Sequence, residues 1–268
     1  MLIGLVYLRT KTPFKMIEKG EILSSKENNI GYIEFFHPAH NSLPGNLLSE
    51  LKTAIDTQSQ DQATSITVIK SRGDRTFCAG ASFTELASIE NIDEGKKFFM
   101  GFANVINAIR QSSNIVIVVV QGKTVGGGVG LASAADYCLA TKFASIRLSE
   151  LAVGIGPFVI GPAVERKIGS SQFTKMSLTP DIWQTADWAK QNGIYHECFE
   201  SNDEMIMFLN DFTKTLSSYN PVALTKLKTV FWEGTDHWNE LLERRAAISG
   251  ELVLTAASKD AINSFLQS

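Results

Sequence analysis

The chain has 268 residues, a formal net charge of −3 and 44% hydrophobic residues. That length can bury one large core with an appendage, and the lack of low-complexity tracts indicates an ordered globular protein. Basic residues are scattered rather than clustered, which excludes a typical nucleic-acid-binding surface. No apolar run approaches the about 18 residues needed to span a bilayer. We therefore expect neither nucleic acid nor membrane as a partner.

Taken in chain order, the first part of the sequence alternates between strand and helix patterns. Residues 21–25 and 31–36 predict two strands around an Asn28-Asn29 turn. Recurring apolar residues at helical spacing predict helices over 44–58, after Ser82 and over 94–111. Further strands are predicted at 65–70, 115–121, 137–140 and 145–148. Repeated strand–helix crossovers predict an α/β core with right-handed connections.

After about residue 200 only helical patterns remain. One amphipathic helix carries Met205 to Leu216, a second begins at Asn220-Pro221, and a last one is predicted from Trp238 to Phe265. We therefore divide the chain into a core over 16–200 and a helical region over 201–268, with 1–15 as an N-terminal extension. Three aromatic residues of the helical region are predicted to anchor a subunit interface: Phe231, Trp232 and Trp238.

The cysteines and histidines give no sign of a metal site. Cys78, Cys138 and Cys198 lie at equal intervals, which fits neither a zinc site nor a short disulfide framework. Reduced thiols and a cytoplasmic location are expected. The four histidines form no His-Glu-x-x-His pattern, so no metal is expected.

The most informative segment is the glycine cluster at 126–130, which follows the apolar run 115–120. A Val/Ile-rich run of this length predicts a strand buried on both faces, and the glycines predict a tight turn into a small-residue helix. A phosphate-binding P-loop ending in Gly122-Lys123-Thr124 would need a glycine where Ile117 stands, so that interpretation is rejected. A dinucleotide fingerprint fits poorly, because Ser133 replaces its third glycine. Two interpretations remain: close packing of a small-residue helix, or an oxyanion hole in which backbone N–H groups bind a developing negative charge.

A second segment, 75–86, also follows a strand pattern and leads into a helix. Together with 37–43, 126–136 and 148–157, it resembles the crotonase superfamily, the enoyl-CoA hydratase/isomerase group. The resemblance extends from about residue 16 to the C-terminus, with four motifs in the family's order. It implies a crotonase-type spiral of ββα turns followed by a C-terminal helical oligomerisation region. It also implies a homotrimer or hexamer in which the C-terminal helices pack on neighbouring subunits and cover the pocket.

The resemblance also assigns roles to individual residues. The N–H groups of Ala81 and Gly127 would bind the thioester oxygen of an acyl-CoA substrate. The carbonyl of Ala79 would face the adenine of coenzyme A, which Ala39 and His40 would flank. No permanently bound cofactor is implied, because coenzyme A is part of the substrate. The family usually has Asp where this chain has Ser82, a residue that can also begin a helix.

Glu150 is the candidate general acid/base. It stands among Leu148, Leu151 and Val153, and such apolar surroundings raise the pKa of a carboxyl group toward neutrality. The alternative is an exposed charge at a helix start. Related hydratases often carry another glutamate where this chain has Gly130.

With Glu150 alone, three functions stay open. A branch of the family that includes methylglutaconyl-CoA hydratases also has Gly at the position of Gly130, which favours a hydratase acting on a short or branched unsaturated acyl-CoA. A single glutamate is also sufficient for a Δ3,Δ2-enoyl-CoA isomerase. A non-catalytic acyl-CoA-binding protein is the third possibility. The side chains predicted to shape the acyl pocket are Phe83, Phe158 and Val159.

Overall fold

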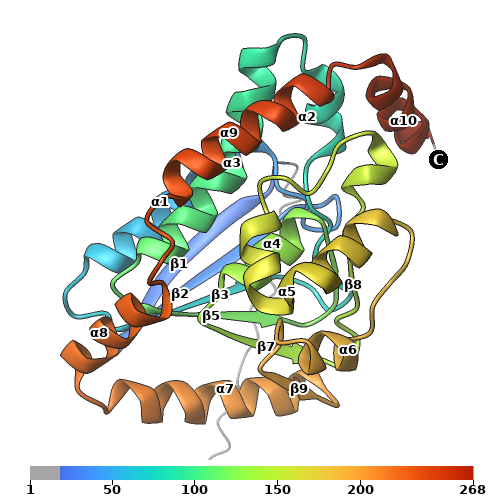
Figure 1. The fold of residues 1–268 in the computed structure, drawn as a ribbon. Coiled ribbons are helices and arrows are strands. Elements are labelled where there is room, and N and C mark those ends of the chain that lie inside the picture. The colour runs from blue at the N-terminus through green and yellow to red at the C-terminus, as the bar shows by residue number, and fades with distance from the viewer. Residues whose placement is uncertain (1–18, 268) are drawn as a thin grey trace, which may run out of the picture.

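A computed structural model describes residues 19–267 (Figure 1). Its main feature is a six-stranded sheet in which β1 is antiparallel to β2 and the other neighbouring strands are parallel. The strands in spatial order are β1 (Glu21–Glu27), β2 (Ile30–Phe36), β3 (Ile66–Ser71), β5 (Ile115–Val120), β7 (Tyr137–Thr141) and β9 (Glu197–Phe199). The predicted α/β class is confirmed. The predicted extension over 1–15 lies outside the described residues.

A second, smaller sheet has the order β4-β6-β8. It consists of β4 (Thr76–Cys78), β6 (Lys123–Val125) and β8 (Ile146–Arg147), all parallel. Two of these strands, β4 and β6, have no counterpart in the sequence predictions, because three-residue strands are too short to show a periodic pattern.

Helices cover both faces of the six-stranded sheet. On one face, Val116, Val118 and Val120 of β5 share a core with α1 (Gly45–Gln60) and α3 (Ile92–Gln111). On the other face, the alternate residues of β5 pack with α7 (Asn202–Ser217) and α8 (Pro221–Phe231). All six residues of β5 are buried, as predicted for a strand covered on both sides.

The chain end forms two helices, not the single helix predicted from Trp238 to Phe265. These are α9 (Trp238–Leu252), which packs along α3, and α10 (Ala256–Gln267). The helical geometry is interrupted between residues 252 and 256. The Thr255 hydroxyl accepts a hydrogen bond from the backbone N–H of Ser258 at 3.3 Å and so starts a new helix.

Two of the three predicted interface anchors are core residues. Trp232 and Trp238 are 6% and 5% exposed and pack edge to face with ring centroids 5.7 Å apart. They cannot anchor a partner, because they already pack inside a single chain. Phe231 alone among the three is exposed.

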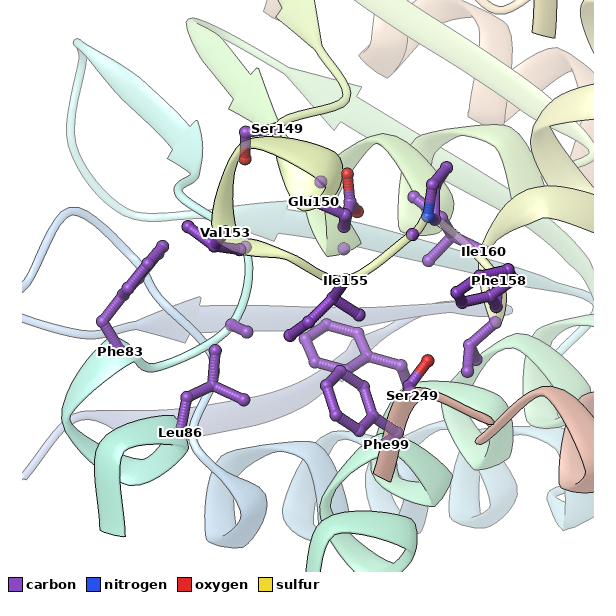
Figure 2. A pocket seen from close by; sticks show the side chains of 18 of the residues that line it. Phe83, Leu86, Phe99, Ser149, Glu150, Val153, Ile155, Phe158, Ile160 and Ser249 are labelled. Atoms are coloured by element: carbon purple, nitrogen blue, oxygen red, sulfur yellow. The ribbon is translucent and has the colours of Figure 1, made fainter. Parts of the chain in front are cut away.

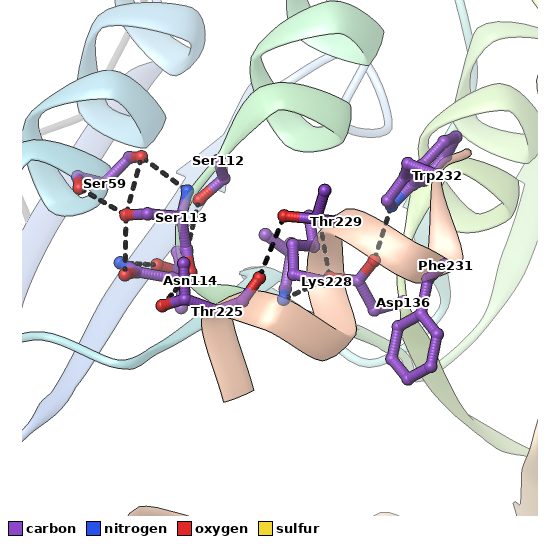
Figure 3. A network of polar contacts seen from close by, with 12 residues as sticks. Ser59, Ser112, Ser113, Asn114, Asp136, Thr225, Lys228, Thr229, Phe231 and Trp232 are labelled. Carbon is purple, nitrogen blue, oxygen red and sulfur yellow. Dashed lines mark hydrogen bonds and ion pairs between the residues drawn. The ribbon is translucent and has the colours of Figure 1, made fainter. Parts of the chain in front are cut away.

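A buried polar network ties α8 to the sheet (Figure 3). Lys228 Nζ lies 2.6 Å from Asp136 Oδ2, and Trp232 Nε1 donates to Asp136 Oδ1 at 2.7 Å. The backbone N–H of Val116 on β5 donates to the same carboxylate at 2.7 Å. Asp136 therefore joins the start of β7, the centre of the sheet and the C-terminal region through one carboxylate.

Two further helices carry no sequence prediction, α5 (Gly161–Leu178) and α6 (Ala186–Gln191). Within α5 the backbone leaves helical geometry at Gly169, with φ 73° and ψ 162°, which interrupts the apolar periodicity on which a prediction depends. Across residues 19–267, no helix has the length and apolar character needed to cross a bilayer.

Candidate active site

Three chain segments leave the same end of the small sheet side by side. Residues 79–81 follow β4, residues 126–127 follow β6, and residues 148–150 follow β8. Because the strands are parallel and adjacent, their carboxyl ends meet at one edge, where open α/β sheets bind ligands. The three sequence motifs on these segments are thereby brought together.

The first two segments approach each other through glycine. Gly80 has φ 87°, and a Cβ on it would lie 3.0 Å from the carbonyl oxygen of Val125 and 3.5 Å from the nitrogen of Gly127. Gly126 has φ 50° and ψ −115° and begins α4 (Gly127–Ala134). Residues with side chains rarely adopt such positive φ values, so glycine at 80 and 126 lets the two turns lie in contact.

The turns open into a cavity whose empty space, together with its opening to solvent, is about 580 Å³ (Figure 2). Its walls are largely apolar, and Glu150 is the only ionisable residue among those described that line it. The lining includes Ala79, Ala81, Gly127 and Glu150 together with Phe83, Leu86, Phe99, Phe102, Ser149, Val153, Ile155, Phe158, Val159, Ile160 and Ser249. The predicted pocket residues Phe83, Phe158 and Val159 all lie in this wall.

Glu150 opens a four-residue 3₁₀ turn, η1 (Glu150–Val153), and lines the cavity (Figure 2). Its Oε1 would be 2.8 Å from a Cβ on Gly126, so the carboxyl group lies directly beside the glycine turn. Burial raises the pKa of Glu150 to about 7, opposed in part by a hydrogen bond from its own backbone N–H. The predicted rise in pKa is present. Leu151, one of the apolar neighbours named from the sequence, is 45% exposed and lies outside the cavity lining.

Ala81 and Gly127 both line the cavity. Gly127 is the first residue of α4, whose opening N–H groups have no partner within the helix. In the described part of the chain, neither N–H donates to a protein acceptor. Ser82, beside Ala81, starts α2 (Phe83–Ser88) by accepting the N–H of Glu85 at 3.4 Å.

Ala39 and His40 lie outside the cavity lining. Both are exposed, in a loop whose His40 has φ 53°. The loop nevertheless joins the site, because the N–H of Ala79 donates to the carbonyl of His40 at 3.1 Å. Buried Asn41 holds it there by donating to the carbonyls of Arg72 and Thr76 at 2.8 and 2.9 Å.

The position of Gly130 is closed by an apolar side chain. A Cβ on Gly130 would lie 2.4 Å from Cγ2 of Ile160, which is itself 4% exposed. The structure therefore has no second carboxylate beside Glu150 in the described wall of the cavity, and the space is filled by a branched aliphatic group.

Several lining residues carry no site prediction from the sequence. Phe99 and Phe102 belong to the apolar stripe of α3 and look like ordinary core residues, whereas Ser249 comes from α9. No local signal marks Ser249, because it reaches the cavity only through the packing of α9 on α3. Among residues 19–267, no group of three or more His, Cys, Asp or Glu side chains could hold a metal ion.

Residues 25–267 match the family model described as enoyl-CoA hydratase/isomerase. A short-chain-enoyl-CoA hydratase of Clostridium acetobutylicum is 24% identical, covering 94% of this chain and 96% of its own. A crotonyl-CoA hydratase of Syntrophomonas wolfei is 26% identical, covering 92% and 95%. The crystal structure of an enoyl-CoA hydratase from Bacillus halodurans superposes with a TM-score of 0.84 at 20% identity, covering 91% and 99%.

Proposed function

Because the chain belongs to the enoyl-CoA hydratase/isomerase family, we propose that its cavity binds the acyl group of an unsaturated acyl-CoA and that Glu150 transfers the proton. The observation that carries this proposal is the position of the Glu150 carboxyl group, buried beside the turn at Gly126 and Gly127 with a pKa of about 7. A group with that pKa can both accept and return a proton near neutral pH.

The N–H groups of Ala81 and Gly127 form the oxyanion hole in this proposal. They belong to two turns in contact. Gly127 is also the first residue of α4, where the helix dipole adds a positive partial charge. Negative charge builds up on the thioester oxygen when water adds to C3 or when C2 loses a proton, so donors fixed there stabilise the enolate. Each such donor typically contributes about 10²–10³ in rate.

We assign hydration as the reaction, on a short or branched 2-enoyl-CoA. The Glu150 carboxylate takes a proton from water while the water oxygen bonds to C3, and the electrons of the double bond move to the enolate oxygen. The protonated Glu150 then returns its proton to C2. The names of the two full-length hydratase relatives support this assignment.

Isomerisation is the second candidate, favoured by Ile160. An ordered water needs two to four polar partners, and at Gly130 the space where a second carboxylate could stand is filled by the aliphatic side chain of Ile160. The only side-chain hydroxyls in the described lining are those of Ser149 and Ser249. A proton taken from C2 of a 3-enoyl-CoA and returned at C4 needs no water. Glu150 alone can carry out both transfers.

Incubation of crotonyl-, methylglutaconyl- and 3-hexenoyl-CoA in deuterated water separates the two reactions. Hydration yields a 3-hydroxyacyl-CoA with deuterium at C2, whereas isomerisation of 3-hexenoyl-CoA yields the 2-enoyl isomer. E150Q is expected to lower kcat by at least about 10²-fold with little change in acyl-CoA affinity. A wild-type protein that binds acyl-CoA but converts none of the three would instead be a non-catalytic binding protein.

Self-association through α8 is a further part of the proposal. Its outer side exposes apolar side chains that the single chain leaves uncovered, among them Val222, Leu227, Val230 and Phe231. Burial of such a surface favours association. We expect a trimer or hexamer by light scattering after gel filtration, and F231E is expected to shift it toward the monomer.

A further inference from the structure

Glu150 belongs to a short 3₁₀ turn whose own hydrogen bonds are too few to fix its position. A single 3₁₀ turn of four residues is marginal in isolation, and Ser149 before it makes no side-chain capping bond. The carboxyl group is not fixed at its tip either. Its Oε2 is buried without a hydrogen-bond partner in the described residues, and the one bond affecting its pKa comes from its own backbone. The position of the carboxyl group therefore depends on what holds the backbone of η1.

The turn ends at Gly154, which has φ 74°. The N–H of Gly154 donates to the carbonyl of Leu151 at 3.1 Å, and that of Ile155 to the carbonyl of Glu150 at 3.0 Å. The carbonyl of Gly154 in turn accepts the hydroxyl of Ser258 on α10 at 3.1 Å. A Cβ on Gly154 would come within 2.4 Å of Ser258 Oγ, so the two elements lie in direct contact.

Ser258 is itself firmly placed. It is fully buried, its Oγ lies 3.0 Å from Thr255 Oγ1, and its N–H donates to the same hydroxyl at 3.3 Å. One turn further along α10, Ile262 is 1% exposed. Near the end of the helix, the ring of Phe265 stacks on Phe83 of the cavity wall with centroids 4.1 Å apart. Helix α10 thus contacts both η1 and α2, two elements that line the cavity.

We propose that Ser258 is a positioning residue for Glu150: its hydroxyl fixes the end of the turn on which the carboxyl group is carried, which makes α10 part of the catalytic apparatus. The inference rests on the proposed function of Glu150. In this inference the Ser258 hydroxyl orients the Glu150 carboxyl group, although Ser258 lies more than a hundred residues further along the chain.

The test compares S258A with S264A. Ser264 lies on the same helix and is exposed, and its hydroxyl donates within the helix to the carbonyl of Asp260. For S258A we expect kcat to fall by about 10- to 100-fold with unchanged affinity for a non-reactive acyl-CoA, because small displacements of a catalytic group carry costs of that size. The acid limb of its kcat–pH profile should move to lower pH, because a loosened carboxyl group gains contact with water. S264A should match the wild type in all three measurements.

Hydrogen exchange gives a readout that does not need turnover. The amides of Gly154 and Ile155, which close the turn, should exchange faster in S258A than in S264A. Wild-type kcat and exchange rates in S258A would overturn the proposal, as would equal changes in both variants. If S258A does not fold, T255V is compared with S264A in its place, because T255V removes the hydroxyl that supports Ser258.

The two proposals fail in different ways. If E150Q retains wild-type turnover, the proposed function of Glu150 is wrong whatever S258A does. If E150Q loses turnover while S258A keeps it together with its pH profile, Glu150 keeps its role and only the positioning by Ser258 is wrong.

Discussion

Ile160 lies so close to Gly130 that a Cβ added to the glycine would stand 2.4 Å from Cγ2 and 2.7 Å from Cβ of the isoleucine. The two residues lie far apart in the chain: Gly130 belongs to α4, and Ile160 directly precedes α5. Because the isoleucine branches at Cβ, its contacting atoms cannot turn away freely. This contact determines both how α4 packs and which side chains position 130 tolerates.

We therefore expect G130A to destabilise the protein. In an ordinary helix interior this change stabilises by up to about 1 kcal/mol. Here, overpacking against Ile160 should reverse the sign and cost about 1–3 kcal/mol, measured by urea unfolding. In I160A the extra methyl group has room, so G130A/I160A should lose less stability than the sum of the two single variants. Additive losses would show that the contact does not limit position 130.

Stability should depend on pH through Glu150. Its pKa is about 7 in the folded chain against 4.5 for an ordinary glutamate, so between these values the folded state binds more protons than the unfolded state. Folding stability from this group therefore falls as pH rises through that window and stays lower above it. E150Q should unfold like the wild type at pH 4 and be more stable at pH 8 by about 1–3 kcal/mol. A difference that is the same at both pH values would contradict this assignment.

Removal of the charge at Lys228 should weaken the attachment of the C-terminal region. The Lys228 and Asp136 side chains are 3% and 2% exposed, so K228M would leave a buried carboxylate without its counter-charge. A loss of about 3–5 kcal/mol in the free energy of unfolding is expected. K226M, at an exposed lysine on the same helix, should change it by less than about 0.5 kcal/mol. Equal unfolding midpoints for the two variants would argue against a structural role for the pair.

Phe158 is expected to limit the length of the acyl group. In Figure 2 it lies on the opposite side of Glu150 from Phe83, and its ring packs over Gly156. F158A should raise kcat/KM for six- and eight-carbon enoyl-CoA relative to crotonyl-CoA by about tenfold or more. F143A, at a phenylalanine that is 62% exposed, serves as the control and should leave the ratio unchanged. An unaltered ratio in F158A would place the end of the acyl group elsewhere.

Local sequence patterns were sufficient for the parts of the molecule that depend on neighbours in the chain. The run 115–120 predicted a strand buried on both faces, and the structure confirms it. The glycines at 126–130 predicted a turn leading into a helix, which is α4. The rise in the pKa of Glu150 could also be predicted, although the cavity wall rather than Leu151 provides its surroundings.

Features created by long-range packing could not be predicted in the same way. The sequence pattern predicts Trp232 and Trp238 as interface anchors, yet both are buried within the chain, where Trp232 also donates to Asp136. Ser249 and Ser258 look like unremarkable helix residues until α9 and α10 dock. Their roles depend on which helix packs on which, and apolar periodicity marks a buried face without naming its partner.

The small sheet β4-β6-β8 separates two tasks that the site must combine. In the proposed function, the segments after β4 and β6 supply backbone N–H donors, which belong to the main chain and do not depend on the side chain at position 150. The segment after β8 supplies the one reactive side chain. Replacement of that side chain therefore alters what is done to a bound thioester without dismantling the means of polarising it, which makes position 150 the natural starting point for redesigning this enzyme toward other acyl-CoA reactions.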